Sequence, residues 1–564
     1  MSRKEKRSIA LLALMGIHRS LAETVSTGAV LPYMVALIDT EKAETMPVLK
    51  SIARIAGGSE TKFILCSTLL FLALYALRCA YLVFYDYVNG RIIRDISSTY
   101  SVRLFRYYMT RPYRFFFDKN SSLLQRNVTS VISGLMQGVI SNGLYLLSYG
   151  LTVVLLLGVI VASGVPGLLA AALILCLIYV FLSRNIKKRT KEIADEANSH
   201  SRLLHRTVME CFRGIKDFKL CADEENVIGF VSGEYAVLNE LRVKRKLINS
   251  IPNQILELGT VMILALILIG GNRSGNMSES VALLSLCGAS AIRIRSALSG
   301  ILSKVTAIKD NSAYYDEIID DIRASVECDG VPSEGESPAF KDRIEIRNVS
   351  YRYPGGDREV FRNFSLTIRK GESVGIVGHS GKGKTTLADL LTGLISPQNG
   401  ELLIDGVSLR GRESAWQKSV GYVPQDIFLI DGSILKNIAL YEPEESVDRE
   451  RARKALKMAQ LLDYVDSLPE RENSLIGENG LLISGGQKQR IGIARALYRN
   501  PEILIFDEAT NSLDCETEQA FINTLHSLSG EYTMIVISHR SETMQNCGRI
   551  VNLNDREATE LAEG

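Results

Sequence analysis

The chain has 564 residues, with 65 Lys or Arg against 63 Asp or Glu, and its formal net charge is +2 at pH 7. This length exceeds a single compact core, since domains usually hold roughly 100–200 residues. The near-neutral charge gives no support for nucleic-acid binding, which usually shows as a strongly basic domain. The mean hydropathy is slightly positive although 23% of the residues are charged. This pairing predicts an apolar part joined to a polar part.

Six apolar stretches come first along the chain, and each is long enough to cross a membrane as a helix, which takes roughly 20 residues. They cover about 9–38, 63–87, 137–163, 166–183, 251–270 and 279–304. The first is the weakest, because His18, Arg19 and Glu23 interrupt it. Its basic start resembles a signal peptide, but no cleavage site of small residues follows. We therefore expect a membrane helix with its basic end inside.

Two long polar segments, 89–135 and 184–249, are rich in Arg and Lys, which places both in the cytoplasm. Six spans then return the chain to the inside. The nine cysteines show no metal-site spacing and are expected to be free thiols. A helix in the first outer loop would collect five apolar residues on one face: Val48, Leu49, Ile52, Ile55 and Ala56. This predicts either an amphipathic helix on the outer leaflet or a loop helix packed on the spans.

Residues 323–340 lack apolar periodicity and gather Gly, Pro, Ser and acidic residues, so they are predicted to be a linker. Beyond this segment, short β-branched runs alternate with helical stretches, which indicates a mostly parallel α/β domain. The predicted fold is an all-α transmembrane domain of six helices over 1–322, followed after the linker by an α/β P-loop domain over 341–564.

The sharpest motif is a phosphate-binding loop. It follows a strand-like run that starts at Ser373 and precedes a helical stretch, which is the context that a P-loop requires. Lys384 would reach the β- and γ-phosphates, and the Thr385 hydroxyl would ligate Mg²⁺. The nucleotide-binding residues predicted here are Gly378, His379, Ser380, Gly381, Lys382, Gly383, Lys384, Thr385 and Thr386.

A second strand-like run, 503–506, ends in Asp507 and Glu508. An aspartate at a strand end beside a P-loop suits Mg²⁺, and the following carboxylate can orient the attacking water. Alone, this pattern more often marks a strand followed by a helix cap.

Further motifs make the chain resemble the ABC ATPases, and they follow one another in order over about 340–545. Ile483-Ser484-Gly485-Gly486-Gln487 resembles the signature motif, although the family's usual first residue is Leu. Gln425 matches the Q-loop, Asp514 the D-loop and His539 the H-switch. Tyr353 stands where the family stacks an aromatic ring on adenine, and Glu478 matches a stretch that touches coupling helices in ABC exporters.

The resemblance implies ATP and Mg²⁺ as cofactors, with Thr385, Gln425 and Asp507 at the metal. It also implies that Glu508 is the general base, that His539 senses the γ-phosphate, and that Gln425 links the site to the membrane domain. In this family each ATP lies between the P-loop of one domain and the signature of another. A second copy of the chain is therefore the expected partner, with Ser484 and Gly486 acting on its nucleotide.

The membrane half resembles bacterial lipid-linked oligosaccharide flippases of the PglK type, at several less specific stretches. These are Ala22-Glu23-Thr24, Leu31-Pro32, Arg78, 115–128 and 251–257. It departs from the family at Asn253, where a basic residue is usual, and at Ser299-Gly300, where a further arginine is missing. Charges inside spans are expensive and often functional. Arg78, Arg293 and Arg295 therefore either bind an anionic head group such as pyrophosphate, or pair with Glu23 and Glu257.

The resemblance thus predicts an ATP-driven exporter of the bacterial inner membrane that moves an amphipathic, lipid-linked anion outward. The first alternative is an exporter of a peptide or a hydrophobic compound. A non-transport ABC protein is disfavoured by the six predicted spans. A degenerate partner of a heterodimer is disfavoured by Glu508 and the near-consensus signature.

Overall fold

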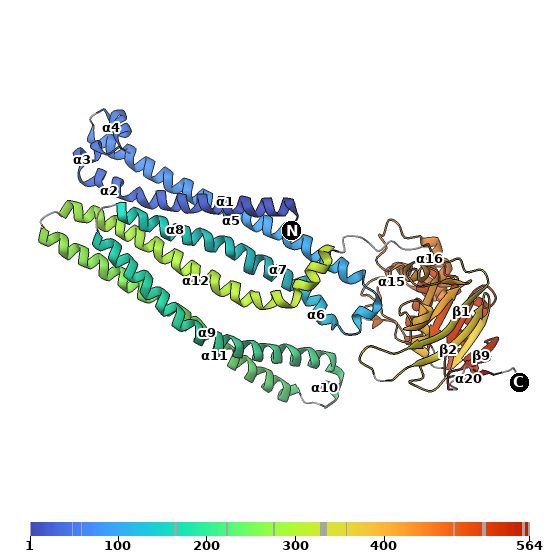
Figure 1. Cartoon of the computed structure of the whole chain (residues 1–564). Coiled ribbons are helices and arrows are strands. Elements are labelled where there is room, and N and C mark those ends of the chain that lie inside the picture. Colours follow the sequence, from blue (N-terminus) through green and yellow to red (C-terminus); the bar gives the residue numbers. More distant parts are fainter. Residues whose placement is uncertain are drawn as a thin grey trace. The chain divides into compact units, whose positions relative to one another are not determined.

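The computed structural model divides the chain into two compact units, and each is described by itself (Figure 1). The first contains Met1–Phe105 and Gln125–Val326, and the second Arg106–Leu124 and Glu327–Gly564. The structure describes residues 2–47, 49–57, 59–162, 166–221, 224–274, 277–327, 336–356, 358–477, 480–509, 515–554 and 559–561.

The first unit is helical throughout its described length. Its long helices pack in pairs, α9 along α11 and α1 along α8 (Figure 1). The elements that lie wholly or partly in this unit are α1 Arg3–Gly28, α2 Val30–Ile38, α3 Thr40–Thr45, α4 Lys50–Ala56, α5 Glu60–Met109, α6 Ser121–Arg126, η2 Asn127–Val131, α7 Ile132–Leu135, η3 Met136–Ser141, α8 Asn142–Ala162, α9 Pro166–Arg213, α10 Ile215–Cys221, α11 Glu224–Ser274 and α12 Met277–Glu327.

The first apolar stretch folds as two helices, because α1 ends at Gly28 and α2 begins at Val30. Pro32 explains the break: a proline has no N–H to donate to the carbonyl four residues earlier, here that of Gly28. Within the described residues, three helical segments are apolar and long enough to span a membrane: Arg3–Ile38, Glu60–Met109 and Ser121–Ala162. The other predicted spans, 166–183, 251–270 and 279–304, lie on α9, α11 and α12.

The first outer loop forms the short helix α4, which packs against the neighbouring helices. Leu49, Ile52 and Ala56 are buried in one cluster with Phe63 of α5. Ile55 points away and is 76% exposed, and Val48 lies outside the described residues. The packed loop helix therefore accounts for three of the five predicted apolar residues.

The end of the helical half differs in detail from the predicted boundary at residue 322. Helix α12 continues to Glu327, so the first part of the predicted linker is helical, whereas residues 328–335 lie outside the described part of the chain. The contacts also group residues 106–124, from the first predicted cytoplasmic segment, with the second unit. The domain limits of 1–322, 323–340 and 341–564 stay a prediction.

The second unit contains two sheets. A four-stranded antiparallel sheet has the order β2-β1-β4-β5, and a six-stranded sheet has the order β10-β9-β3-β8-β7-β6. The elements are η1 Tyr113–Phe116, β1 Arg343–Tyr351, β2 Phe361–Arg369, β3 Ser373–Val377, α13 Lys384–Leu391, β4 Asn399–Ile404, β5 Val407–Ser408, α14 Glu413–Gln417, β6 Val420–Val423, α15 Ile434–Ala439, α16 Arg449–Met458, α17 Leu462–Ser467, η4 Arg471–Asn473, α18 Gly485–Tyr498, β7 Ile503–Asp507, α19 Cys515–Leu528, β8 Thr533–Ile537, α20 Ser541–Met544, β9 Arg549–Asn552 and β10 Thr559–Leu561.

The six-stranded sheet confirms the predicted parallel arrangement, since β9, β3, β8, β7 and β6 pair in parallel and only β10 is antiparallel. The separate antiparallel sheet was not predicted. Its clearest signal is the turn between β4 and β5, where Asp405 and Gly406 both have positive φ, 49° and 79°. Asp-Gly is the preferred pair for a two-residue hairpin of this kind.

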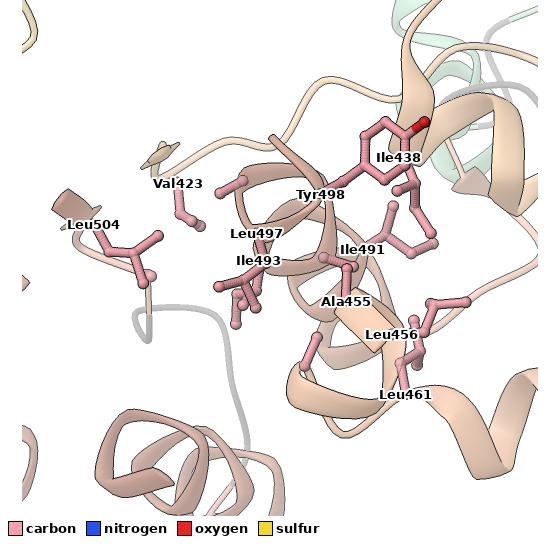
Figure 2. Close-up of a cluster of buried hydrophobic side chains, with 14 of the residues drawn as sticks. Val423, Ile438, Ala455, Leu456, Leu461, Ile491, Ile493, Leu497, Tyr498 and Leu504 are labelled. Carbon is pink, nitrogen blue, oxygen red and sulfur yellow. The ribbon is translucent and has the colours of Figure 1, made fainter. Parts of the chain in front are cut away.

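One hydrophobic cluster fixes the helices of this unit to its parallel sheet (Figure 2). Ile491, Ile493 and Leu497 of α18 lie in one buried cluster with Leu456 of α16 and Leu504 of β7, and all five are at most 5% exposed. Removing a large aliphatic side chain from such a core typically costs about 2–5 kcal/mol of stability. This packing sets the position of α18, whose first turn carries the predicted signature motif.

Candidate functional site

The predicted catalytic residues lie at one edge of the parallel sheet. The P-loop follows β3, His539 follows β8 by two residues, and Asp507 ends β7. Because β3, β8 and β7 are neighbours and parallel, their carboxyl ends meet at the same edge. In open α/β sheets ligands bind outside this edge. The topology thus brings together residues that are 155 positions apart in the sequence.

The loop between β3 and α13 has the backbone conformation of a phosphate-binding loop. Gly381 and Gly383 have positive φ, 79° and 95°, which side chains other than glycine rarely adopt. A Cβ on Gly383 would also lie 2.6 Å from a methyl group of Val360. Lys384 is the first residue of α13, so the helix amino terminus and its unpaired N–H groups face the loop.

The ammonium group of Lys384 lies at the centre of the site, and the residue is 6% exposed. Its Nζ donates to the Gly378 carbonyl at 2.9 Å and lies 3.1 Å from Glu508 Oε1. It also contacts His539 Nε2. A phosphate bound by the loop would meet this ammonium directly.

Glu508 has an unusual backbone. Its φ of 49° lies in the left-handed region, and its N–H donates to the Ile537 carbonyl at 2.8 Å. A non-glycine residue in this region carries local strain, which often occurs at functional sites. The strained turn directs the carboxylate to the site, where Oε1 lies 3.1 Å from His539 Nε2. The imidazole either accepts from Lys384 or, when protonated, donates to Glu508.

Asp507 is 3% exposed and has two hydroxyl partners. Tyr422 Oη donates to its Oδ2 at 3.2 Å, and the Thr385 hydroxyl also bonds to the carboxylate. Burial raises the pKa of Asp507, while these two hydrogen bonds oppose the rise. Magnesium prefers oxygen ligands and usually takes one or two from the protein together with phosphates. A hydroxyl and a carboxylate in contact beside the P-loop fit that ion.

Tyr353 lies next to the P-loop helix. Its hydroxyl is 3.0 Å from Thr386 Oγ1, and its ring packs edge-on against Phe117 with centroids 5.5 Å apart. Burial raises the pKa of the phenol, which therefore stays protonated at neutral pH. The predicted adenine-stacking ring is thus within one helical turn of the phosphate loop.

Other predicted residues in the described part of the chain do not contact the cluster of Lys384, Glu508 and His539. Gln425 is exposed and has no hydrogen bond to another described residue. Asp514 and Glu478 lie outside the described residues. At the tip of the loop, His379, Ser380 and Gly381 are exposed, and the His379 N–H donates to Asn554 Oδ1 at 2.8 Å. Asn554 was not identified from the sequence, because no motif marks it.

The signature motif starts helix α18. Ser484 is the N-cap, and it forms a capping box in which its hydroxyl accepts from the Gln487 N–H and its own N–H donates to Gln487 Oε1. Ser484 and Gly485 are exposed, whereas Gly486 is buried. No hydrogen bond or ion pair within the described part of the chain joins this motif to the cluster around Lys384. The first residues of the motif are thus accessible at the helix amino terminus.

The arginines predicted to bind an anion have carboxylate neighbours in two of three cases. Arg78 NH2 lies 3.7 Å from Glu23 Oε1, and Arg295 NH1 donates to Glu257 Oε2 at 2.5 Å. Arg293 has no ion-pair partner among the described residues and lies near Arg78, so the two positive charges repel each other.

Arg19 joins this charged group, and the sequence reasoning did not identify it as a candidate. Its guanidinium lies 3.9 Å from Glu23 and 3.5 Å from Asp86, with the rings of Tyr85, Tyr145 and Tyr149 at 5.1–5.3 Å. The sequence feature that could have identified Arg19 is its four-residue spacing from Glu23, which places both residues on one face of a helix. The Nε atoms of Arg19 and Arg78 are buried without a hydrogen-bond partner.

Comparisons with known proteins agree with this architecture. Residues 45–291 match the family model of the ABC transporter transmembrane region, and residues 361–511 match that of the ABC transporter. A solved structure of a bacterial Atm1-family ABC exporter with ATP bound superimposes with a TM-score of 0.72 and 25% identity. The match covers 100% of this chain and 94% of that one.

Two curated relatives match a smaller part of the chain. The alpha-hemolysin translocation ATP-binding protein HlyB of Escherichia coli O6:H1 is 43% identical over 215 residues, which are 38% of this chain and 30% of the relative. The leukotoxin translocation ATP-binding protein LktB of Mannheimia glucosida is 42% identical over 224 residues, 40% of this chain and 31% of the relative. These matches span less than a third of the relatives' length.

Proposed function

Since the chain belongs to the ABC transporters and joins a transmembrane region to an ATP-binding domain as an exporter half-transporter does, we propose that it hydrolyses ATP to move a substrate outward. It is an integral membrane protein of the bacterial inner membrane, with the ATP-binding domain in the cytoplasm. The single observation that carries the proposed activity is the convergence of Lys384, Glu508 and His539 at the carboxyl edge of the sheet.

The residues at this edge have roles that phosphoryl transfer requires. The loop N–H groups and Lys384 hold the phosphates, and Glu508 orients the attacking water. Thr385 and Asp507 would hold Mg²⁺, which when bound would neutralise phosphate charge. His539 contacts the γ-phosphate beside Glu508. Positioning and electrostatics supply most of the rate in this chemistry, because the protein takes little part in covalent steps.

A dimer of two copies completes the ATP sites in this proposal. The support is the exposed Ser484 at a helix amino terminus, which has no bond to the P-loop of its own chain. Each site would then use one P-loop and the partner's signature, and a two-fold dimer would hold two equivalent sites.

Mixing two inactive variants tests the dimer and the hydrolysis together. Lys384→Ala and Ser484→Ala chains each lose both sites as homodimers. A mixed dimer has one site with both changes and one with neither, so an equal mixture should recover up to about a quarter of wild-type ATPase activity. No recovery in mixtures whose heterodimers are verified by affinity tags would contradict independent composite sites. A wild type without ATPase activity would contradict the proposed function itself.

For the substrate we propose an amphipathic anion, such as a lipid-linked oligosaccharide pyrophosphate. The support is a local excess of positive charge among the described residues of the membrane half: Arg19 and Arg78 lie beside Glu23, Arg19 also lies near Asp86, and Arg293 lies near Arg78. Arginine suits phosphate groups because its planar fork donates two parallel hydrogen bonds. The ion pair of Arg295 with Glu257 makes Arg295 the weakest of the predicted ligands.

A peptide or protein is the second candidate substrate, and the names of the relatives favour it. Two relatives are described as translocation proteins for alpha-hemolysin and leukotoxin, although the match to each covers only about two fifths of this chain.

Reconstituted protein separates the two candidates. We expect a lipid-linked pyrophosphate to stimulate ATPase activity, and Arg293→Gln to reduce that stimulation while the basal activity stays unchanged, because Lys384 and Glu508 lie on a separate domain. Arg295→Gln is the matched control and should have a smaller effect. Stimulation by peptides alone, with no response to the lipid-linked anion, would contradict the proposed substrate class and favour the second candidate.

A further inference from the structure

The side chain of Tyr422 reaches Asp507 across two neighbouring strands. Tyr422 lies on β6 and pairs with Ile505 of the parallel strand β7, two residues before Asp507. Residues two apart on a strand point to the same face, so the phenol of Tyr422 and the carboxylate of Asp507 share one face of the sheet. A diagonal neighbour at this spacing is within reach of an aromatic side chain.

The contact is a hydrogen bond from the phenol to the carboxylate. Tyr422 Oη donates to Asp507 Oδ2 at 3.2 Å, and Asp507 is buried, with 3% of its surface exposed. Burial and the charge of Asp507 raise the pKa of Tyr422, so the hydroxyl keeps its proton and remains a donor. Thr385 contacts the same carboxylate from the P-loop helix. Asp507 is thus held by one hydroxyl from α13 and one from β6.

The surroundings show why the carboxylate needs such a donor. Asp389 of α13 is 8% exposed and close enough to Asp507 for the two charges to interact. Like charges in a buried site repel, so the orientation of the Asp507 carboxylate depends on the hydroxyl groups that hold it. The phenol gives Asp507 a fixed partner on the side of β6.

We propose that Tyr422 is a positioning residue for Mg²⁺ at the ATP site, where its hydroxyl holds the Asp507 carboxylate in the orientation that ligates the ion. This inference deepens the proposed ATPase function and rests on it. Outer partners that orient a metal-ligating carboxylate typically change metal affinity or activity by 10–100-fold when they are removed. Tyr422 lies three residues before Gln425. The strand whose phenol contacts Asp507 therefore continues into the segment that is predicted to reach the membrane domain.

Removing one oxygen tests the proposal, because Tyr422→Phe keeps the ring in the core. Purified full-length protein is titrated with a fluorescent ATP analogue, first in EDTA and then at rising Mg²⁺ concentrations. We expect the affinity in EDTA to stay within about twofold of wild type, while the Mg²⁺ concentration that gives half of the Mg²⁺-dependent effect rises about 10-fold. The Mg²⁺ dependence of ATPase activity should shift equally, with kcat at saturating Mg²⁺ little changed.

Tyr441→Phe is the matched control, since this tyrosine is 76% exposed on the same domain. An unchanged Mg²⁺ midpoint in Tyr422→Phe would overturn the proposal. A loss of nucleotide affinity in EDTA as large as the shift in the Mg²⁺ midpoint would also overturn it, because such a loss would show a structural role that does not involve the metal. Thermal unfolding of both variants verifies that they are folded. A wild type that binds nucleotide without hydrolysing it would contradict the ATPase function, and the binding titration would still decide the role of Tyr422.

Discussion

The ATP-binding domain and the helical membrane half both bury charged side chains, but they arrange them differently. In the ATP-binding domain, Lys384, Glu508 and His539 come from different strand ends and lie within contact of one another at one edge. In the membrane half, Arg19, Glu23 and Arg78 lie on α1 and α5, and both guanidinium groups share the one carboxylate of Glu23.

The difference follows from the two backbones. Parallel strands end at a common edge, so the loops that follow them can gather several charged groups around one ligand. Helices that cross a membrane have their backbone groups satisfied internally, and a charge on their sides pairs with a charge one turn away on the same helix or on a neighbouring helix. Convergent charges are therefore expected to govern catalysis, and paired charges to govern stability until a substrate competes for them.

The largest effect is expected from Glu508, because it is the convergent group that we propose orients the attacking water. Glu508→Gln should lower ATPase activity about 10²–10⁴-fold, which is the usual contribution of a general base, while ATP binding persists. Steady-state hydrolysis and nucleotide binding in the purified protein measure the two properties. Glu444→Gln, at an exposed position of the same domain, should leave both unchanged. Activity within tenfold of wild type would remove Glu508 from this role.

The paired charges of the membrane half can be tested through stability. Glu23→Gln removes the carboxylate that two largely buried guanidinium groups share and leaves only Asp86 beside Arg19, since the side chains of Arg19 and Arg78 are 9% and 10% exposed. Breaking a buried pair in this way typically costs about 3–5 kcal/mol. Thermal unfolding in detergent should show the loss.

Glu257→Gln is the matched control for this experiment. It breaks the exposed pair with Arg295, in which the two side chains are 55% and 37% exposed. Such pairs contribute only about 0–1 kcal/mol. Equal melting temperatures for the two variants would show that the charges around Glu23 do not stabilise the fold, and would leave a substrate role as their main function.

The two regions also differ in how far the sequence predicts them. The P-loop, Asp507 and Glu508 were identified because each occupies a fixed place after a strand, and the structure brings Lys384, Glu508 and His539 together. The φ of Glu508 and the reach of Tyr422 were not predicted, because both depend on which strands are neighbours. In the membrane half the sequence indicated which residues are charged. The choice between pairing and substrate binding depends on helix packing, which no local pattern specifies.

The smallest effect concerns Asp389, a buried carboxylate of the ATP-binding domain that lacks the paired arrangement seen around Glu23. Burial raises its pKa to about 6, with a further contribution from the nearby Asp507, and its side chain has no hydrogen bond to another described residue. The unfolded chain ionises this group near pH 4, whereas the folded chain holds the proton up to about pH 6. Stability therefore falls as the pH rises through this window and stays lower above it.

Asp389→Asn removes the ionisation, so it should raise the melting temperature at pH 7–8 in the absence of nucleotide, and the gain should shrink toward pH 4. A shift of about two pKa units corresponds to at most about 3 kcal/mol.

Asp405→Asn should behave in the opposite way. Burial would raise the pKa of Asp405, but hydrogen bonds from the backbone N–H groups of Arg343, Lys341 and Asp342 outweigh this and lower it, so its ionised form stabilises the fold. Its stabilising contribution is present at neutral pH and is lost as the pH falls through its lowered pKa. If Asp389→Asn destabilised the protein at pH 8 as Asp405→Asn does, the carboxylate of Asp389 would have a stabilising partner, and the contrast with the paired charges of the membrane half would not hold.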